Sequence, residues 1–323
     1  MSRIASALIL LASGSVCGVT QAAEPAYPTR PIRMVVPFAP GGGSDILART
    51  LAPKLSAATG QTWVVDNRSG AAGNLGAEIV ARANPDGYTV LKALNTQLTA
   101  NPSLYKLPFD VQKDLQPVTM LATADHVLVV HPSVQARTFK EFLALAKQKP
   151  GAFNYASSGA GSAIHMAAEL LKYRTGIDLV HIPYKGGGPA ALAVISGEAQ
   201  VMTGTAASVL PFLTSGRLRG LATTGPRRSK VLPELPTVAE SGYPGFDTSQ
   251  WYGILVPAAT PRSITERIRN EMLKVLQHPD MRAALVSQGV ELETTTPEGM
   301  AARIKTETAT NAAVIKAAGI RVE

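Results

Sequence analysis

Short apolar runs and helical repeats alternate along the first third of the chain. Residues 32–36 are mainly apolar, and Leu47, Leu51 and Leu55 recur beyond them at the four-residue spacing of one helix face. Such alternation predicts β-α-β units whose parallel sheet is covered by helices. We predict strands at residues 32–36, 63–66 and 88–94 and helices at residues 44–57 and 74–83. Pro53 is expected to kink the first helix or to end it early.

The same alternation restarts after a long apolar stretch at residues 118–130. Farther along, a proline-rich link leads to an apolar, extended stretch at residues 251–256. The rest of the chain shows three helical patterns with no strand pattern between them. The predicted strands are residues 153–156, 179–182, 199–202 and 218–223, and the predicted helices are residues 138–148, 162–174, 189–195, 263–277, 281–287 and 297–318.

These elements predict an α/β chain that crosses twice between two lobes. The last three helices need a sheet face to cover, and the first β-α-β-α-β unit has few helices of its own. We predict a lobe 1 of residues 24–124 and 250–323 and a lobe 2 of residues 125–249. Each lobe is expected to be a mostly parallel sheet flanked by helices, and two crossover strands form the hinge. Ligands of open α/β sheets lie beyond the carboxyl ends of strands, so the cleft between the lobes is the predicted site.

The N-terminal residues 1–23 have the features of an export signal. Arg3 supplies the positive start, an apolar stretch follows, and small residues end at Ala22 and Ala23. The apolar stretch is shorter than the roughly 20 residues of a membrane span. Cleavage there removes Cys17, the only cysteine, so we expect an exported mature chain without a disulfide.

Composition narrows the classes of ligand. The formal net charge is +8, which is compatible with acidic ligands. The basic residues are scattered, their densest cluster at residues 227–230 is short, and aromatic residues make up only 5% of the chain. A basic groove with stacking rings is therefore poorly supported, and we expect no nucleic-acid partner.

Three glycine- and serine-rich turns stand between a predicted strand and a predicted helix. They read PFAPGGGSD at residues 37–45, NYASSGAGS at residues 154–162 and HIPYKGGG at residues 181–188, and the first and third resemble each other. Small residues leave backbone N–H groups accessible, and a helix N-terminus adds positive potential. These turns are therefore predicted to hold an anion.

The sequence lacks the motifs that nucleotide binding requires, and a catalytic role for its serine and histidine pair stays an alternative. A phosphate-binding loop needs a lysine where Ser44 stands, and a dinucleotide loop needs a third glycine where Ile46 stands. Ser162 and His165 are three residues apart on one helix, and Asp45 is a possible base, so a hydrolase remains an alternative that needs an oriented hydrogen-bond chain. The other interpretation is a helix cap, a helix histidine and a first-turn acid. The five histidines show no ligand spacing, and we predict neither a metal nor a cofactor.

Taken together, the motifs resemble those of one family. The chain resembles the substrate-binding proteins of tripartite tricarboxylate transporters, the Bug family of periplasmic receptors, over nearly all of its length after residue 27. The motifs that carry the resemblance are VVPFAPGGGSD (35–45), DNRSGAAGN (66–74), PDGYT (85–89), NYASSGAGS (154–162), HIPYKG (181–186), LPTVAESGYPGF (235–246) and WYG (251–253).

The resemblance implies a type II periplasmic-binding fold of the Venus-flytrap kind. It implies a monomeric receptor, and not an enzyme, that holds a small carboxylate or a related solute and hands it to membrane transporter subunits; a sensor receptor is the alternative partner. In the family, backbone and hydroxyl groups from both lobes hold the carboxylate. The ligand-binding residues expected on this basis are Phe38, Ala39, Pro40, Gly41, Gly42, Gly43, Ser44, Asp45, Asn95, Thr96, Ser157, Ser158, Gly159, Ala160, Gly161, Ser162, His165, Gly204 and Thr205.

Two departures from the family pattern bear on the ligand. Gly204 stands where many relatives carry an acid that receives a ligand ammonium group, so we predict a ligand without an obligatory amine. Lys92 stands where relatives more often have an apolar residue. We expect its side chain to extend to the surface, and the alternative is a charge directed toward the cleft. Leu94 predicts a more apolar wall.

Overall fold

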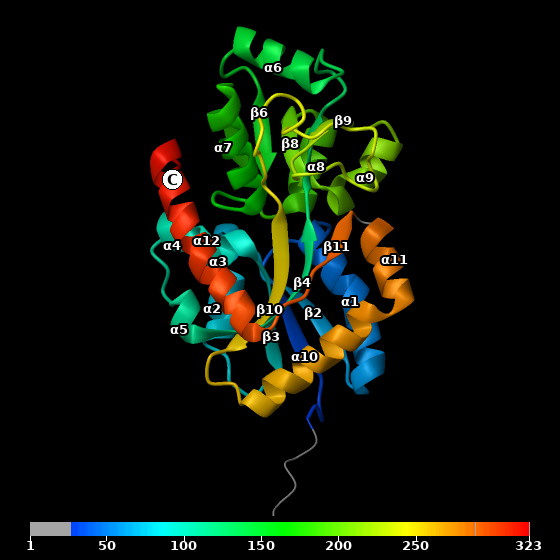
Figure 1. The fold of residues 1–323 in the computed structure, drawn as a ribbon, viewed down its shortest axis with the longest axis vertical. Helices are drawn as coiled ribbons and strands as arrows, with labels where there is room; N and C mark the ends of the chain where they lie inside the picture. The colour runs from blue at the N-terminus through cyan, green and yellow to red at the C-terminus, as the bar shows by residue number, and fades with distance from the viewer. Residues whose placement is uncertain (1–26, 288, 323) are drawn as a thin grey trace, which may run out of the picture.

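The structure is a computed structural model that describes residues 27–287 and 289–322. The predicted signal peptide at residues 1–23 lies outside the described residues. Two α/β lobes follow one another along the long axis of the molecule, and two extended segments run between them (Figure 1). The predicted two-lobe α/β architecture is therefore confirmed.

The sheet of lobe 1 has six strands in the order β11-β4-β10-β3-β1-β2. Strand β1 is parallel to β2 and β3, whereas β10 lies antiparallel between β3 and β4, and β11 is antiparallel to β4. The strands are β1 (Ile32–Val36), β2 (Trp63–Asn67), β3 (Thr89–Leu94), β4 (Leu115–Ala124), β10 (Gln250–Pro257) and β11 (Val290–Leu292).

The sheet of lobe 2 has five strands in the order β7-β6-β8-β5-β9. Strand β6 is parallel to β7 and β8, and β5 lies antiparallel between β8 and β9. Both sheets are thus mixed, and not mostly parallel as predicted, because a strand that enters from the other lobe runs against its neighbours. The strands are β5 (His126–Val130), β6 (Asn154–Ser157), β7 (Val180–Pro183), β8 (Val201–Thr205) and β9 (Arg219–Thr223).

Helices cover both faces of each sheet (Figure 1). In lobe 1 they are α1 (Gly43–Thr59), the 3-10 turn η1 (Ala71–Gly73), α2 (Asn74–Ala81), α3 (Asn95–Thr99), α4 (Asn101–Leu104), α5 (Val111–Asp114), α10 (Arg262–Gln277), α11 (Pro279–Ser287) and α12 (Pro297–Ala318). In lobe 2 they are α6 (Phe139–Gln148), α7 (Ala163–Thr175), α8 (Gly187–Ser196) and α9 (Ala206–Thr214).

Helix α1 continues through Pro53 to Thr59, so of the two effects expected of Pro53, a kink or an early end, the early end does not occur. A proline inside a helix costs about 3 kcal/mol. Leu47, Leu51 and Leu55 are completely buried against the sheet. Burying one leucine contributes roughly 1.5–3 kcal/mol, so the three together outweigh the proline.

The C-terminal helices return to lobe 1. Helices α10 and α11 share a core cluster with α1, whereas Met300 and Ile304 of α12 pack on the opposite face of the sheet. The segment between them was predicted to lack a strand, which is wrong, because β11 adds to the edge of β4. Its three residues are too few to show a strand pattern in the sequence.

The two crossover segments meet between the lobes. The chain leaves the six-stranded sheet at Ala124, enters the five-stranded sheet at His126 and returns at Gln250. At this level Ser249 Oγ donates a hydrogen bond of 2.7 Å to Asp125 Oδ1. We propose the lobe boundaries at these crossings, with residues 24–124 and 250–323 in lobe 1 and residues 125–249 in lobe 2.

Candidate ligand site between the lobes

The loop before α1 is shaped by Asp45, in the first turn of that helix. Its carboxylate accepts hydrogen bonds from Gly41 N, Arg49 Nε and Asn67 Nδ2, and Asn67 Nδ2 also donates to the carbonyl of Phe38. Burial by itself raises the pKa of Asp45. The hydrogen bonds and the charge of Arg49 lower the pKa by more than burial raises it, so it lies below its ordinary value. Asp45 therefore acts as a fixed anion that shapes the loop, with its oxygens already engaged.

The backbone of this loop contacts the backbone of the similar glycine-rich turn of lobe 2, residues 185–188. A Cβ atom at Gly42 would lie 3.3 Å from Gly187 N, and one at Gly188 would lie 2.5 Å from the carbonyl oxygen of Pro40. A backbone hydrogen bond of 3.1 Å runs from Ala39 N to the carbonyl of Lys185. The lobes approach this closely because most of the facing residues are glycines, which have no Cβ atom.

The contact brings together the N-termini of helices from both lobes. Helix α1 begins at Gly43 and α8 begins at Gly187, next to the contact, and α7 begins nearby at Ala163. Each N-terminus carries unpaired N–H groups and a partial positive charge. The turn at residues 181–188 was predicted to hold an anion, but Gly186, Gly187 and Gly188 were not among the ligand-binding residues expected from the family resemblance.

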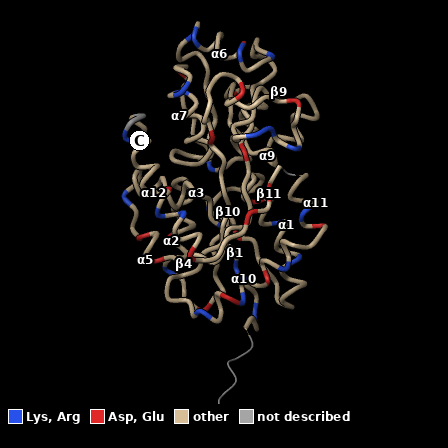
Figure 2. Tube along the Cα trace, viewed as in Figure 1, with Lys and Arg blue, Asp and Glu red and all other residues tan. Residues whose placement is uncertain are grey.

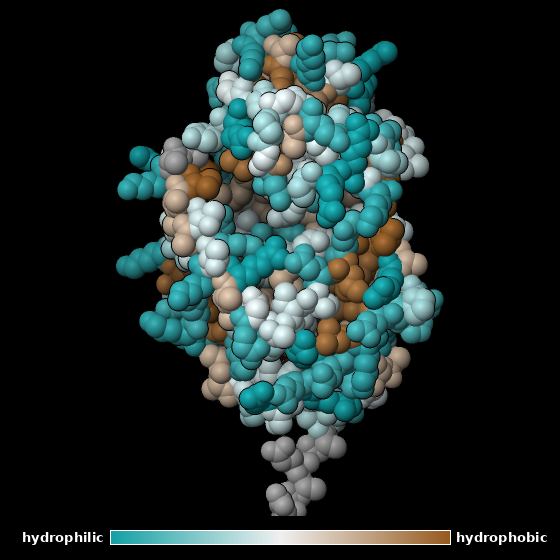
Figure 3. All heavy atoms as spheres, in the orientation of Figure 1, coloured by the Kyte–Doolittle hydropathy of each residue, from teal (hydrophilic) through white to brown (hydrophobic). Residues whose placement is uncertain are grey.

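A small cavity of about 30 Å³ lies at this junction. Its wall includes six of the predicted residues: Phe38, Gly42, Gly43, Ser44, Ser158 and Thr205. The other lining residues are Leu94, Ala163, Ile164, Gly187, Ser208 and Gln250. Figure 3 shows a hollow in the surface where the two lobes meet.

A neighbouring cavity of about 160 Å³ shares Phe38 and Ser158 with the first. Its remaining lining residues are Gly70, Ala71, Ala72, Gly73, Tyr105, Gly159, Ala160, Tyr184 and Lys185. Tyr105 Oη donates to the carbonyl of Ala160 and so links the lobes at this point. No residue in either lining carries a carboxylate. The serine, threonine and tyrosine residues of the two linings carry hydroxyl groups, and the glycines leave backbone N–H groups accessible, so both cavities suit an anion.

The turn before α7 is held by its own side chains. Ser162 is the N-cap of α7, and its Oγ accepts from His165 N at 3.3 Å. Gly161 N donates to His165 Nδ1 at 2.9 Å, so the imidazole carries its proton on Nε2. Ser157 Oγ bonds His181 Nε2 at 2.6 Å. The interpretation of a helix cap and a helix histidine is confirmed, and no Ser162–His165–Asp45 hydrogen-bond chain forms.

Lys92 lies behind the first cavity. Its side chain is 0% exposed, its Nζ donates to Ser44 Oγ at 2.8 Å, and it lies 3.4 Å from the centroid of the Tyr252 ring. Burial lowers the pKa of Lys92 well below its ordinary value, and the negative charge of Asp45 opposes that shift. The expected extension to the surface is wrong, because β3 is an inner strand covered by α1 on this face.

Three other predicted residues lie close to the cavity but outside its wall. Asn95 and Thr96 begin α3, directly after Leu94, and Asn95 Oδ1 and Thr96 Oγ1 find no hydrogen-bond partner among the described residues. A Cβ atom at Gly204 would lie 2.5 Å from Val209 Cγ1, so this position faces α9. Its neighbour Thr205 faces the cavity.

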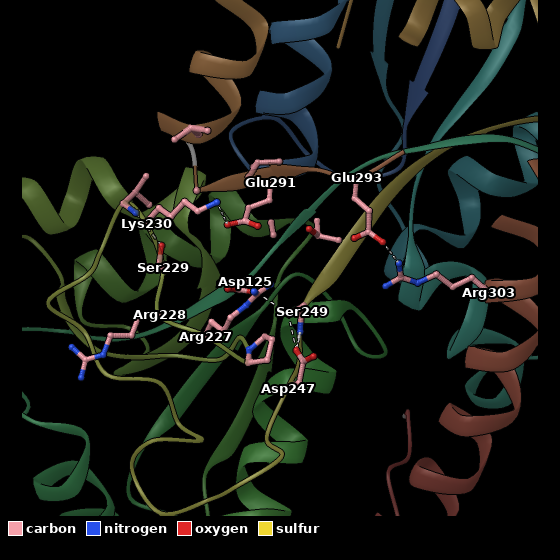
Figure 4. Close-up of a pocket in the computed structure, with 17 residues that line it drawn as sticks. Asp125, Arg227, Arg228, Ser229, Lys230, Asp247, Ser249, Glu291, Glu293 and Arg303 are labelled. Carbon is pink, nitrogen blue, oxygen red and sulfur yellow. Dashed lines mark hydrogen bonds and ion pairs between the residues drawn. The ribbon is translucent and has the colours of Figure 1, made fainter. Parts of the chain in front are cut away.

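A separate cavity of about 270 Å³ lies beside the hinge. Figure 4 shows charged residues from both lobes around it, with Lys230 directed at Glu291 and Ser249 beside Asp125. The Lys230–Glu291 ion pair measures 2.9 Å and joins the loop after β9 to β11. Acids and bases alternate in this wall, so it offers no single sign of charge to a ligand.

The surface of both lobes is mixed in charge. Figure 2 shows basic and acidic residues interspersed over both lobes. Within residues 27–287 and 289–322, no three metal-ligating side chains gather in one place. In the same part of the chain, no helix has the length and apolar character of a membrane-spanning segment.

Comparison with known proteins places these features in one family. The sequence profile of the tripartite tricarboxylate transporter family receptor matches residues 47–320. Protein BugT of Bordetella pertussis (strain Tohama I) is 36% identical over 299 residues, which cover 92% of each chain.

Solved structures agree with this assignment. An R. palustris protein with adipate is 33% identical, with a TM-score of 0.89 over 92% of this chain and 100% of that chain. MatC of Rhodopseudomonas palustris, with bound malate, is 28% identical, with a TM-score of 0.85 over 90% of this chain and 100% of that chain. The profile match and the shared two-lobe fold together show that this chain belongs to the tripartite tricarboxylate transporter receptor family, the family of the periplasmic Bug proteins.

Proposed function

We propose that this protein is a periplasmic receptor that captures a small carboxylate between its lobes and delivers it to the membrane subunits of a tripartite tricarboxylate-type transporter. One observation carries the proposal. The N-termini of α1 and α8, from different lobes, meet beside one cavity that has hydroxyl groups and no carboxylate in its wall. Two positive helix ends repel each other at close range, and an anion between them removes that repulsion.

The chemistry of the wall defines the ligand class. Ser44, Ser158 and Thr205 contribute hydroxyl groups, and the glycines leave backbone N–H groups accessible. A ligand ammonium group has no acidic partner among the residues that line the two cavities. The preferred ligand is therefore a carboxylate without an obligatory amine, and relatives that hold adipate and malate support this class.

Titration calorimetry tests the proposal with adipate, malate and a set of amino acids as probes. We expect Ser158→Ala to weaken binding by one to two decades, because a hydrogen bond to a charged group is worth roughly 1.5–3 kcal/mol. Gly42→Val weakens it more strongly, because its side chain enters the space beside Gly187. The exposed Ser287→Ala is the matched control and binds like the parent.

Two outcomes contradict the proposal. If the parent binds none of the carboxylates, the assigned ligand class is wrong. If Gly42→Val binds as tightly as the parent, the loop before α1 is a structural turn and not part of the site. If the tightest ligand is an amino acid that loses affinity when its amine is removed, only one conclusion is contradicted. That conclusion is the preference for a ligand without an obligatory amine, which was drawn from the absence of acidic residues in the cavity walls.

A further inference from the structure

Lys92 is a buried, ionisable side chain near the cavity whose chemistry the proposed site does not yet use. It comes from β3, it is completely buried, and its neighbours on the same strand face, Val90 and Leu94, belong to the apolar core. Burying an amine away from water is costly unless partners compensate for it. Methionine has nearly the same length and would fill this volume without that cost.

The partners of Lys92 compensate for its charge only in part. Its Nζ donates to one oxygen, Ser44 Oγ, and lies over the face of the Tyr252 ring. The charged and titratable groups that face it are Asp45 from α1 and Tyr252 from β10. Asp45 is already engaged by Arg49 and Asn67, and burial raises the pKa of Tyr252, so that phenol is neutral.

The hydrogen bond from Lys92 determines what Ser44 can do. Ser44 Oγ accepts from Lys92, so its own O–H is left to donate. No acceptor among the described residues takes that hydrogen, and Ser44 lines the cavity beside Gly43. A hydroxyl that accepts from an ammonium group becomes a stronger donor, because hydrogen bonds in a chain polarise one another.

We propose that Lys92 is a specificity-determining residue that acts through Ser44: its ammonium group directs the Ser44 hydroxyl toward an anionic oxygen of the bound ligand. The inference rests on the proposed function and deepens it. The ligand oxygen completes a chain from ammonium to hydroxyl to carboxylate, and the buried charge gains the counter-charge that it lacks. Lys92 itself does not touch the ligand.

A double-mutant cycle tests this relay, with adipate and malate as probes in calorimetry. Lys92→Met and Ser44→Ala are each expected to weaken binding by about 10- to 100-fold. The double variant should bind about as weakly as either single variant, because both changes remove the same interaction. Lys147→Met, at an exposed position on α6, removes an equal formal charge and should bind like the parent.

A spectroscopic measurement on the folded parent does not depend on how well the variants fold. In protein labelled with ¹⁵N-lysine, the side-chain signal of Lys92 should move when adipate or malate is added, and that of Lys147 should stay in place. The movement should be lost in Ser44→Ala.

The outcomes separate the inference from the proposed function. If the parent binds and Lys92→Met binds equally well, or the effects of the two substitutions multiply, the relay is wrong while the receptor function stands. An unmoved Lys92 signal at saturation overturns the relay as well. If the parent binds neither probe, the proposed function for this ligand class fails, and the inference fails with it.

Discussion

At the scale of single residues, the glycines of the two facing turns decide how closely the lobes approach. Adjacent positions differ sharply in the space beside them. A Cβ atom at Gly188 would lie 2.5 Å from the Pro40 carbonyl oxygen, whereas one at Gly187 would have only ordinary contacts at 3.5 Å. The obstacle at Gly188 is backbone, which cannot turn away as a side chain does.

This difference predicts a strong and a mild variant at neighbouring positions. Gly188→Ala should weaken adipate or malate binding at least tenfold, because it keeps the lobes apart, and Gly187→Ala should weaken it much less. Thermal melts should show no loss of stability for either, since both residues lie in α8 and alanine favours a helix by about 1 kcal/mol over glycine. Equal affinities for the two variants would show that the lobe contact does not limit binding.

At the scale of elements, strands β6 and β7 and helix α7 carry a stack of three aromatic rings. The rings of His165 and His181 lie 4.2 Å apart, and Tyr155 stacks on His181 at 4.9 Å. Burial lowers the pKa of His165 to about 4, with a contribution from the neighbouring His181, and burial also lowers the pKa of His181 to about 4. Protonation at Nδ1 would also oppose Gly161 N, which donates to that atom.

These pKa values predict that acid destabilises the protein. Between pH 6.5 and about 4 the unfolded chain takes up protons at these histidines and the folded chain does not, so stability falls as the pH falls through this range. A pKa moved from 6.5 to about 4 corresponds to roughly 3 kcal/mol for the well-buried His165.

Urea unfolding at pH 7.5, 5.5 and 4.5 measures this effect. His165→Gln keeps an acceptor for Gly161 N but does not titrate, so its free energy of unfolding should change less with pH than that of the parent. The exposed His278→Gln is the control. A parent whose free energy of unfolding is the same at all three pH values would contradict the prediction.

At the scale of the whole molecule, two crossovers and the contacts between the lobes suggest closure about a hinge. The crossovers are joined at Asp125 and Ser249, and the lobes touch again at the glycine turns and at Tyr105 and Ala160. A ligand that binds both lobes favours the arrangement in which they are close.

Small-angle scattering tests closure. The radius of gyration of the parent should decrease when a carboxylate ligand is added, and Gly188→Ala should show a smaller decrease, because Pro40 blocks the approach of α8. An unchanged radius for the parent at saturation would rule out closure as the means of capture.

Much of the architecture followed from local patterns in the sequence. Leu47, Leu51 and Leu55 predicted α1, and the glycine-rich turns predicted the strand-to-helix connections that precede α1, α7 and α8, because both signals depend on neighbours within one helical turn. The cap role of Ser162 was likewise a local inference. These features need no knowledge of distant contacts.

Tertiary structure decided the rest. Burial of three leucines carried α1 past Pro53, and the edge of β4 made a strand of the three residues of β11. The sequence did not predict the hydrogen bond between Lys92 and Ser44. The two residues are 48 positions apart, and only the packing of β3 against α1 brings them together. The meeting of the two glycine turns depends in the same way on both crossovers. A sequence shows which groups are available, and only the packing of distant segments determines which of them face each other.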